Sequence, residues 1–190
     1  MNTKLLTASI SMALALALNI ANATPIAKDN SNAQNVNMQT TNLTAFDEVL
    51  NRYGDLAVKL GNNDTNKEII FFYDNSCKFC QHELAGLPEI TKSGINVYVL
   101  PFLNHGFYTD NARKMFAAWS TDQPLSTLLT DKDIDKVELK RQVAEEMADL
   151  TMFARNTLNI KKTPFMLFSN GEFIDGYASP HDLVAYLKSH

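Results

Sequence analysis

The chain's two cysteines, Cys77 and Cys80, are separated by Lys78 and Phe79. Thiols three positions apart on a helix lie on the same side, close enough to close a small disulfide ring. Such a tight ring is reduced more readily than a structural bridge, so this spacing favours thiol–disulfide exchange. A bridge built for stability would instead close a long loop, where the unfolded chain loses most entropy.

The surrounding residues predict different roles for the two thiols. Ile69–Tyr73 is a continuous apolar run typical of a buried strand, and a helix is predicted from Cys77 to about Thr91. At the helix start, free backbone N–H groups and the helix dipole favour a thiolate, and Lys78 adds a positive charge. We therefore expect Cys77 to be the nucleophile. Cys80, one turn further in and less exposed, would resolve the mixed disulfide.

Other uses of the two cysteines have to be weighed. A structural disulfide is disfavoured by the minimal loop, and two inert thiols would tend to be joined in an oxidising compartment. Zinc or copper needs more ligands than two thiolates; His82 is near but faces differently, and there is no second Cys-x-x-Cys motif. No metal is predicted, and a metal-binding or chaperone-like module is kept as the alternative from a different class.

The elements that must position the cysteines alternate along the chain. A second strand is predicted over Ile95–Leu100, and strand, helix, strand within about thirty residues implies a parallel, right-handed crossover. Pro88 lies inside the intervening helix and should kink or break it. The later predictions are helices over 110–119, 125–129 and 137–158, strands over 165–168 and 172–177 joined by an Asn-Gly turn, and a last helix over 180–188.

The N-terminal segment predicts export. A basic start, the apolar run Leu5–Leu18 and an Ala-x-Ala end at Ala23 make residues 1–23 a cleavable signal peptide, which implies the periplasm. Residues 24–42 are polar and are expected to be a flexible leader. Apolar residues at spacings of three and four predict an amphipathic linker helix over 43–61. The catalytic domain is expected at 68–190.

The charge of the chain argues against one class of partner. The formal net charge is -4, and the basic stretches, Lys136–Arg141 and Lys161-Lys162, are short, the first being mixed with acids. A nucleic-acid surface needs clustered positive charge along one face. No nucleic-acid partner is therefore predicted.

Two segments resemble the bacterial DsbC/DsbG disulfide isomerases: 72–82 (FYDNSCKFCQH) and 163–177 (TPFMLFSNGEFIDGY). The resemblance covers about residues 68–190. It implies an α/β thioredoxin fold with a helical insertion between the βαβ unit and the hairpin that follows a cis Pro164. A cis proline would leave the Thr163 backbone free to pair with an extended substrate segment, so Thr163 and Pro164 are the expected substrate-binding residues. Without the resemblance, this dipeptide is an ordinary helix stop.

The chain also departs from the family pattern. Lys78-Phe79 replaces the usual Gly-Tyr, and this dipeptide is expected to tune thiol acidity and redox potential. Phe71 stands where thioredoxin and DsbA carry a carboxylate, which favours the isomerase branch. The isomerases often carry a second cysteine pair in the insertion. Ser120 stands where one such cysteine is expected, so this second disulfide is not predicted here. The N-terminal dimerisation domain of those isomerases is not recognisable.

The resemblance implies an enzyme that reduces or isomerises disulfides in exported proteins, without an organic cofactor and with a membrane redox partner. A DsbA-like dithiol oxidant is the alternative within the same class. The apolar stripe of the helix predicted over 43–61 is about two and a half heptads, which is marginal for a coiled-coil seam. A monomer is therefore favoured over a homodimer.

Overall fold

The computed structural model describes residues 43–131 and 133–189. The expected signal peptide and polar leader lie outside these ranges. The described residues form a five-stranded sheet in the order β1-β3-β2-β4-β5. Its strands are β1 (Val58–Leu60), β2 (Glu68–Tyr73), β3 (Asn96–Pro101), β4 (Phe165–Phe168) and β5 (Phe173–Asp175).

The pairing of the central strand β2 with its two neighbours positions the cysteine segment. It pairs in parallel with β3, Phe71 facing Val99, and antiparallel with β4, Phe71 facing Met166. All of β2 except Glu68 is buried, as a strand covered on both faces requires. The predicted parallel crossover and the antiparallel β4–β5 hairpin are both confirmed. The chain therefore leaves the carboxyl end of β2 directly into the cysteine segment.

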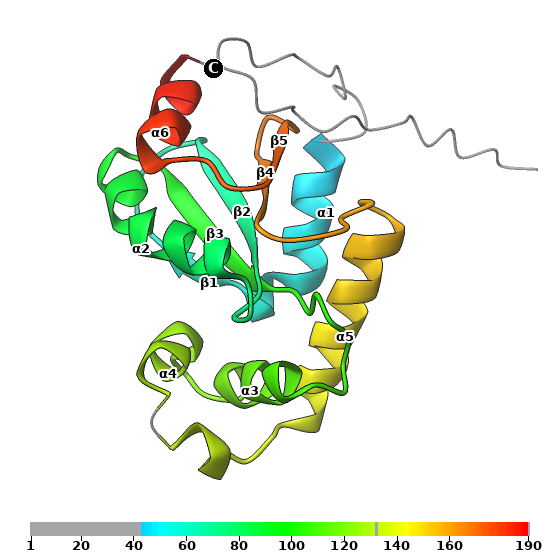
Figure 1. Ribbon diagram of the computed structural model, residues 1–190. Helices are drawn as coiled ribbons and strands as arrows, with labels where there is room; N and C mark the ends of the chain where they lie inside the picture. Colours follow the sequence, from blue (N-terminus) through cyan, green and yellow to red (C-terminus); the bar gives the residue numbers. More distant parts are fainter. Residues whose placement is uncertain (1–42, 132, 190) are drawn as a thin grey trace, which may run out of the picture.

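Helices surround the sheet on both sides in Figure 1, with α2 and α6 on one side and α1 and α5 on the other. Together α3, α4 and α5 form the helical insertion between β3 and β4, as the resemblance implies. None of the helices in the described part of the chain is long and apolar enough to cross a membrane. The bounds are α1 (Leu43–Tyr53), α2 (Lys78–Lys92), α3 (Asp110–Trp119), α4 (Pro124–Thr130), α5 (Arg141–Asn156) and α6 (Pro180–Ser189).

The helix predicted over 43–61 is wrong in its second half. The α-helix ends at Tyr53, a short 3₁₀ turn follows at Gly54–Leu56, and Val58–Leu60 is strand β1, paired antiparallel with β3. The apolar positions there fitted a helical period, but the sheet edge offers backbone partners to a short extended segment. Gly61, with φ +86°, ends a strand rather than a helix.

The first helix packs on its own domain. Phe46 and Val49 are buried, and the Phe46 ring meets Tyr98 of β3 edge-on, with centroids 6.4 Å apart. The Tyr53 hydroxyl donates a 2.7 Å hydrogen bond to Asp149 of α5. The apolar face of α1 is thus part of one core with the sheet.

Pro88 is expected to kink or break its helix, but α2 continues to Lys92 with Pro88 inside it, so the helix is not broken there. Proline costs the helix one backbone hydrogen bond, to residue i−4. Leu84, Leu87 and Ile90 are buried on the face of α2 that packs in the core, which offsets that loss. The helix therefore stays in one piece from the cysteine pair to its C-terminus.

Candidate functional site

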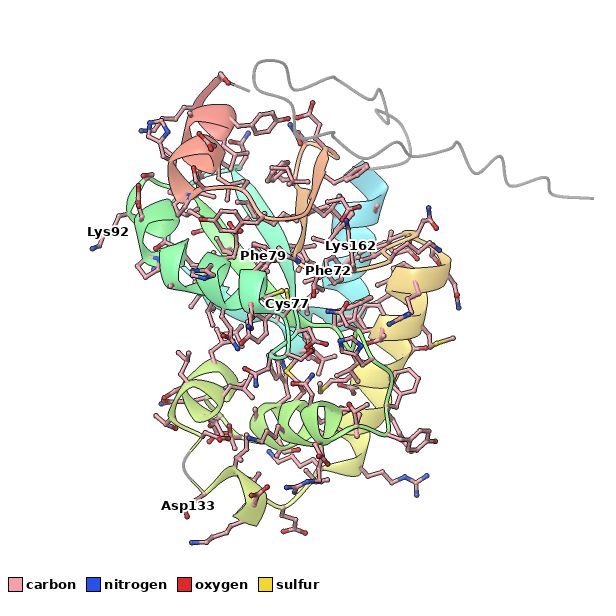
Figure 2. The ribbon with its side chains drawn as sticks, in the orientation of Figure 1. Phe72, Cys77, Phe79, Lys92, Asp133 and Lys162 are labelled. Carbon is pink, nitrogen blue, oxygen red and sulfur yellow. The ribbon has the colours of Figure 1, made fainter. Side chains whose placement is uncertain are left out.

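Cys77 lies at the N-cap of α2, immediately before its first helical residue (Figure 2). Its sulfur accepts a hydrogen bond from the backbone N–H of Cys80 at 3.2 Å, the contact that serine or aspartate oxygens make at this position. The Cys77 N–H donates to the Asp74 carbonyl at 3.0 Å, which closes the turn between β2 and α2. The first thiol is therefore half-buried, at a helix end that offers N–H donors.

Cys80 is fully buried, and the two thiols are free rather than joined in a disulfide. Burial, followed by its hydrogen bond with Cys77, raises the pKa of the Cys80 thiol well above its usual range. A protonated, shielded thiol is a poor attacker of outside disulfides. Cys80 is thus the less exposed of the two thiols, as predicted, whereas their roles as nucleophile and resolving thiol stay predictions.

The Thr163–Pro164 peptide bond is cis, as the resemblance implies. It lies beside the cysteines, because the Cys77 thiol donates to the Thr163 carbonyl with sulfur and oxygen 3.4 Å apart. The Pro164 carbonyl accepts the Gly176 N–H at 2.9 Å, which ties this turn to the end of β5. Segments separated by about ninety residues in sequence thus meet at one sulfur atom.

Sequence reasoning missed a buried carboxylate three residues before Cys77. Asp74 is fully buried and accepts hydrogen bonds from the Ser76 N–H at 2.7 Å, the Ser76 hydroxyl, the Asn104 N–H at 2.7 Å and the Asn111 side chain at 3.0 Å. Buried carboxylates are tolerated when their oxygens are fully paired. Asp74 therefore joins the cysteine turn to the loop after β3 and to helix α3.

Asn104 connects Asp74 to the cis-proline turn. Its backbone N–H binds Asp74, its side-chain amide donates to the Thr163 hydroxyl, and its carbonyl accepts from Arg155 at 2.6 Å. The hydrogen bonds thus run from the cysteine turn through Asn104 to Thr163, whose carbonyl contacts Cys77. A lone Asp or Asn in a loop is usually solvated, so no sequence signal marked this link.

The two residues between the cysteines both face outward. Lys78 is exposed, and the Phe79 side chain is 60% exposed. The Phe79 ring contacts that of Tyr177, with centroids 6.2 Å apart and planes tilted by 39°. The expected influence of Lys78 and Phe79 on thiol chemistry stays a prediction.

The described residues contain neither a cluster of metal ligands nor a carboxylate at position 71 of β2. In residues 43–131 and 133–189, no three His, Cys, Asp or Glu side chains are grouped so that they could hold a metal ion. Phe71, at the position where thioredoxin and DsbA carry a carboxylate, is fully buried among apolar neighbours in β2.

Comparison with known proteins agrees with this architecture. A family model described as a thioredoxin-like domain matches residues 55–190. The chain is 26% identical over 140 residues to the thiol:disulfide interchange protein DsbC of Haemophilus influenzae, covering 73% of this chain and 60% of that protein. It is 25% identical over 126 residues to DsbC of Escherichia coli K12, covering 64% and 51%. The chain thus spans about half to three-fifths of the length of these relatives.

Solved structures agree on the fold. A disulfide interchange protein from Neisseria gonorrhoeae matches with a TM-score of 0.55 at 21% identity, over 71% of this chain and 95% of that one. The catalytic domain of Proteus mirabilis ScsC matches with a TM-score of 0.58 at 14% identity, over 75% and 96%. At such identities the likeness concerns the fold alone.

Proposed function

The chain belongs to the thioredoxin-like domain family, and on that basis we propose that it reduces or isomerises disulfide bonds in exported proteins through Cys77 and Cys80. One observation carries the proposal. The Cys77 sulfur lies at a helix N-cap, 3.4 Å from the carbonyl of Thr163 and next to a cis proline, while its partner thiol is enclosed one turn away. Both relatives described above are named thiol:disulfide interchange proteins.

The first step is an attack by Cys77 on a client disulfide. The Cys77 thiolate forms a bond to one client sulfur, the client S–S bond breaks, and the other client sulfur leaves as a thiolate. The N–H of Cys80, which already points at the Cys77 sulfur, stabilises the negative charge before attack. The client chain would lie along the backbone of Thr163 as an added strand.

The second step decides between reduction and isomerisation. If Cys80 gives up its proton and attacks the Cys77 sulfur, the client leaves fully reduced and the protein becomes oxidised. If the thiol of a third client cysteine first attacks the client sulfur bonded to Cys77, a new client disulfide forms, Cys77 leaves as a thiolate and the protein stays reduced. Burial of Cys80 delays the first route, which leaves time for the second.

The setting of this activity is also part of the proposal. The predicted signal peptide over residues 1–23 supports a periplasmic location, with a membrane redox partner that keeps the pair reduced. The apolar face of α1 is buried against its own sheet, which supports a monomer, because that face is no longer free for a coiled-coil seam. A monomer would reduce disulfides well but rearrange scrambled ones poorly.

Trapping in cells tests the proposal. We expect a Cys80→Ala variant to accumulate mixed disulfides with exported proteins and a Cys77→Ala variant to form none. The wild-type pair should be found reduced in the periplasm. A predominantly oxidised pair would favour the DsbA-like oxidant instead, and stoichiometric zinc or copper at nanomolar affinity would favour the metal-binding module. Equal trapping by both variants would overturn the roles of the two cysteines.

A further inference from the structure

Phe79 has an exposure that exchange chemistry alone does not explain. It stands two residues after the nucleophile with 60% of its side chain exposed, although residues of this type are usually buried. Cysteine exchange needs no aromatic ring at this position. An exposed apolar group beside a reactive atom is typical of a surface that contacts a partner.

The ring of Phe79 is held by a contact with a second aromatic ring. It leans on Tyr177, with centroids 6.2 Å apart and a tilt of 39°, within the range that aromatic pairs prefer. Tyr177 follows Gly176, whose N–H is bound to the Pro164 carbonyl at 2.9 Å and whose φ of +123° suits only glycine. The aromatic pair is thus anchored to the same turn that carries Thr163.

We propose that Phe79 and Tyr177 form a contact surface for an apolar, preferably aromatic, side chain next to the reacting cysteine of a client. The inference rests on the proposed function and names the clients that the site prefers. During exchange the client cysteine is bonded to Cys77, and its backbone lies by Thr163. Phe79 and Cys77 lie close together at the start of α2 (Figure 2), so a side chain one or two residues from that client cysteine would reach Phe79.

Two short peptides test the proposal on the full chain in its reduced form. Each peptide carries one cysteine joined to 5-thio-2-nitrobenzoate, and the residue after the cysteine is Phe in one and Ser in the other. Cys77 attacks the peptide sulfur, the nitrobenzoate thiolate leaves and absorbs light, and Cys80 then releases the peptide thiol as the Cys77–Cys80 disulfide forms. The rate with glutathione as attacker corrects for intrinsic differences between the peptides.

The readout is the ratio of the corrected rate constants within each variant, which cancels any change in the reactivity of Cys77 itself. We expect a ratio of about ten for the wild-type chain, below about two for Phe79→Ser, and about three for Tyr177→Ser. Leu129→Ser is the matched control, since Leu129 is 70% exposed on α4, and its ratio should equal that of the wild type.

The outcomes separate the two proposals. A ratio near one for the wild-type chain, or an undiminished ratio for Phe79→Ser, would overturn the aromatic contact while leaving the exchange activity standing. If neither peptide reacts with the wild-type chain faster than with glutathione, the proposed exchange function itself is wrong.

Discussion

The first turn of α2 and the hydrogen-bonded residues beneath it are adjacent but differ in what they expose. Cys77 is half-buried and Phe79 is exposed. Asp74 and Thr163 are buried, and Asn104 joins them. The thiol proposed to react, that of Cys77, thus belongs to the more exposed residues. Its position depends on the hydrogen bonds that Asp74 and Thr163 make beneath it. Substitutions in the two regions should therefore differ in whether activity or stability responds.

The largest effect is expected from Cys77→Ser. Without the nucleophile no mixed disulfide forms, so the exchange rate should fall by about a thousandfold or more. Serine is a preferred N-cap residue and can accept the Cys80 N–H, so the free energy of unfolding should change by less than about 1 kcal/mol. Peptide exchange kinetics and urea denaturation measure the two quantities. A large loss of stability would show that the exposed turn is also structural.

Asp74→Ala should show the opposite pattern. It leaves the donors of Ser76, Asn104 and Asn111 without their buried acceptor, so the free energy of unfolding should fall by about 3 kcal/mol. Asp74→Asn keeps the volume and one acceptor oxygen, and should lose about half as much. Urea denaturation of the reduced chain measures both. An alanine variant within about 0.5 kcal/mol of the wild type would contradict the supporting role.

The pH dependence of stability should reveal the buried thiol. The folded-state pKa of Cys80 is raised, so its contribution is complete below the unfolded thiol pKa of about 8.5 and is lost as the pH rises above it. Between pH 8.5 and 10 the reduced chain should lose up to about 2 kcal/mol. Cys80→Ala should show a shallower slope, and equal slopes would contradict an enclosed Cys80.

The smallest effect on stability is expected from polar contacts of helix α3, one to the buried Asp74 and one to the exposed Asp135. Asn111→Ala removes one donor to Asp74 and should cost about 1 kcal/mol. Asp135→Ala breaks the exposed ion pair with Arg113 and should cost less than about 0.5 kcal/mol. Thermal denaturation at matched pH compares the two. Equal losses would show that burial does not distinguish these contacts.

Much of the fold could be predicted from local pattern. The strand over 69–73 could be predicted because burial on both faces leaves a continuous apolar run. The helix over 110–119 could be predicted because burial along one stripe leaves apolar residues three and four positions apart. Val58–Leu60 was misassigned, because three residues are too few to show a period and their conformation is decided by pairing with β3.

The sequence by itself determined which chemistry could be proposed for the site, since two cysteines at this spacing after a buried strand favour exchange. Only the tertiary structure decided which residues support and flank them. Asp74, Asn104 and Thr163 are far apart along the chain, and so are Phe79 and Tyr177. Hydrogen bonds and ring contacts act over a few ångströms in space. Such contacts between residues far apart in the sequence cannot be predicted from local pattern, because they form only when the sheet brings its strand ends together.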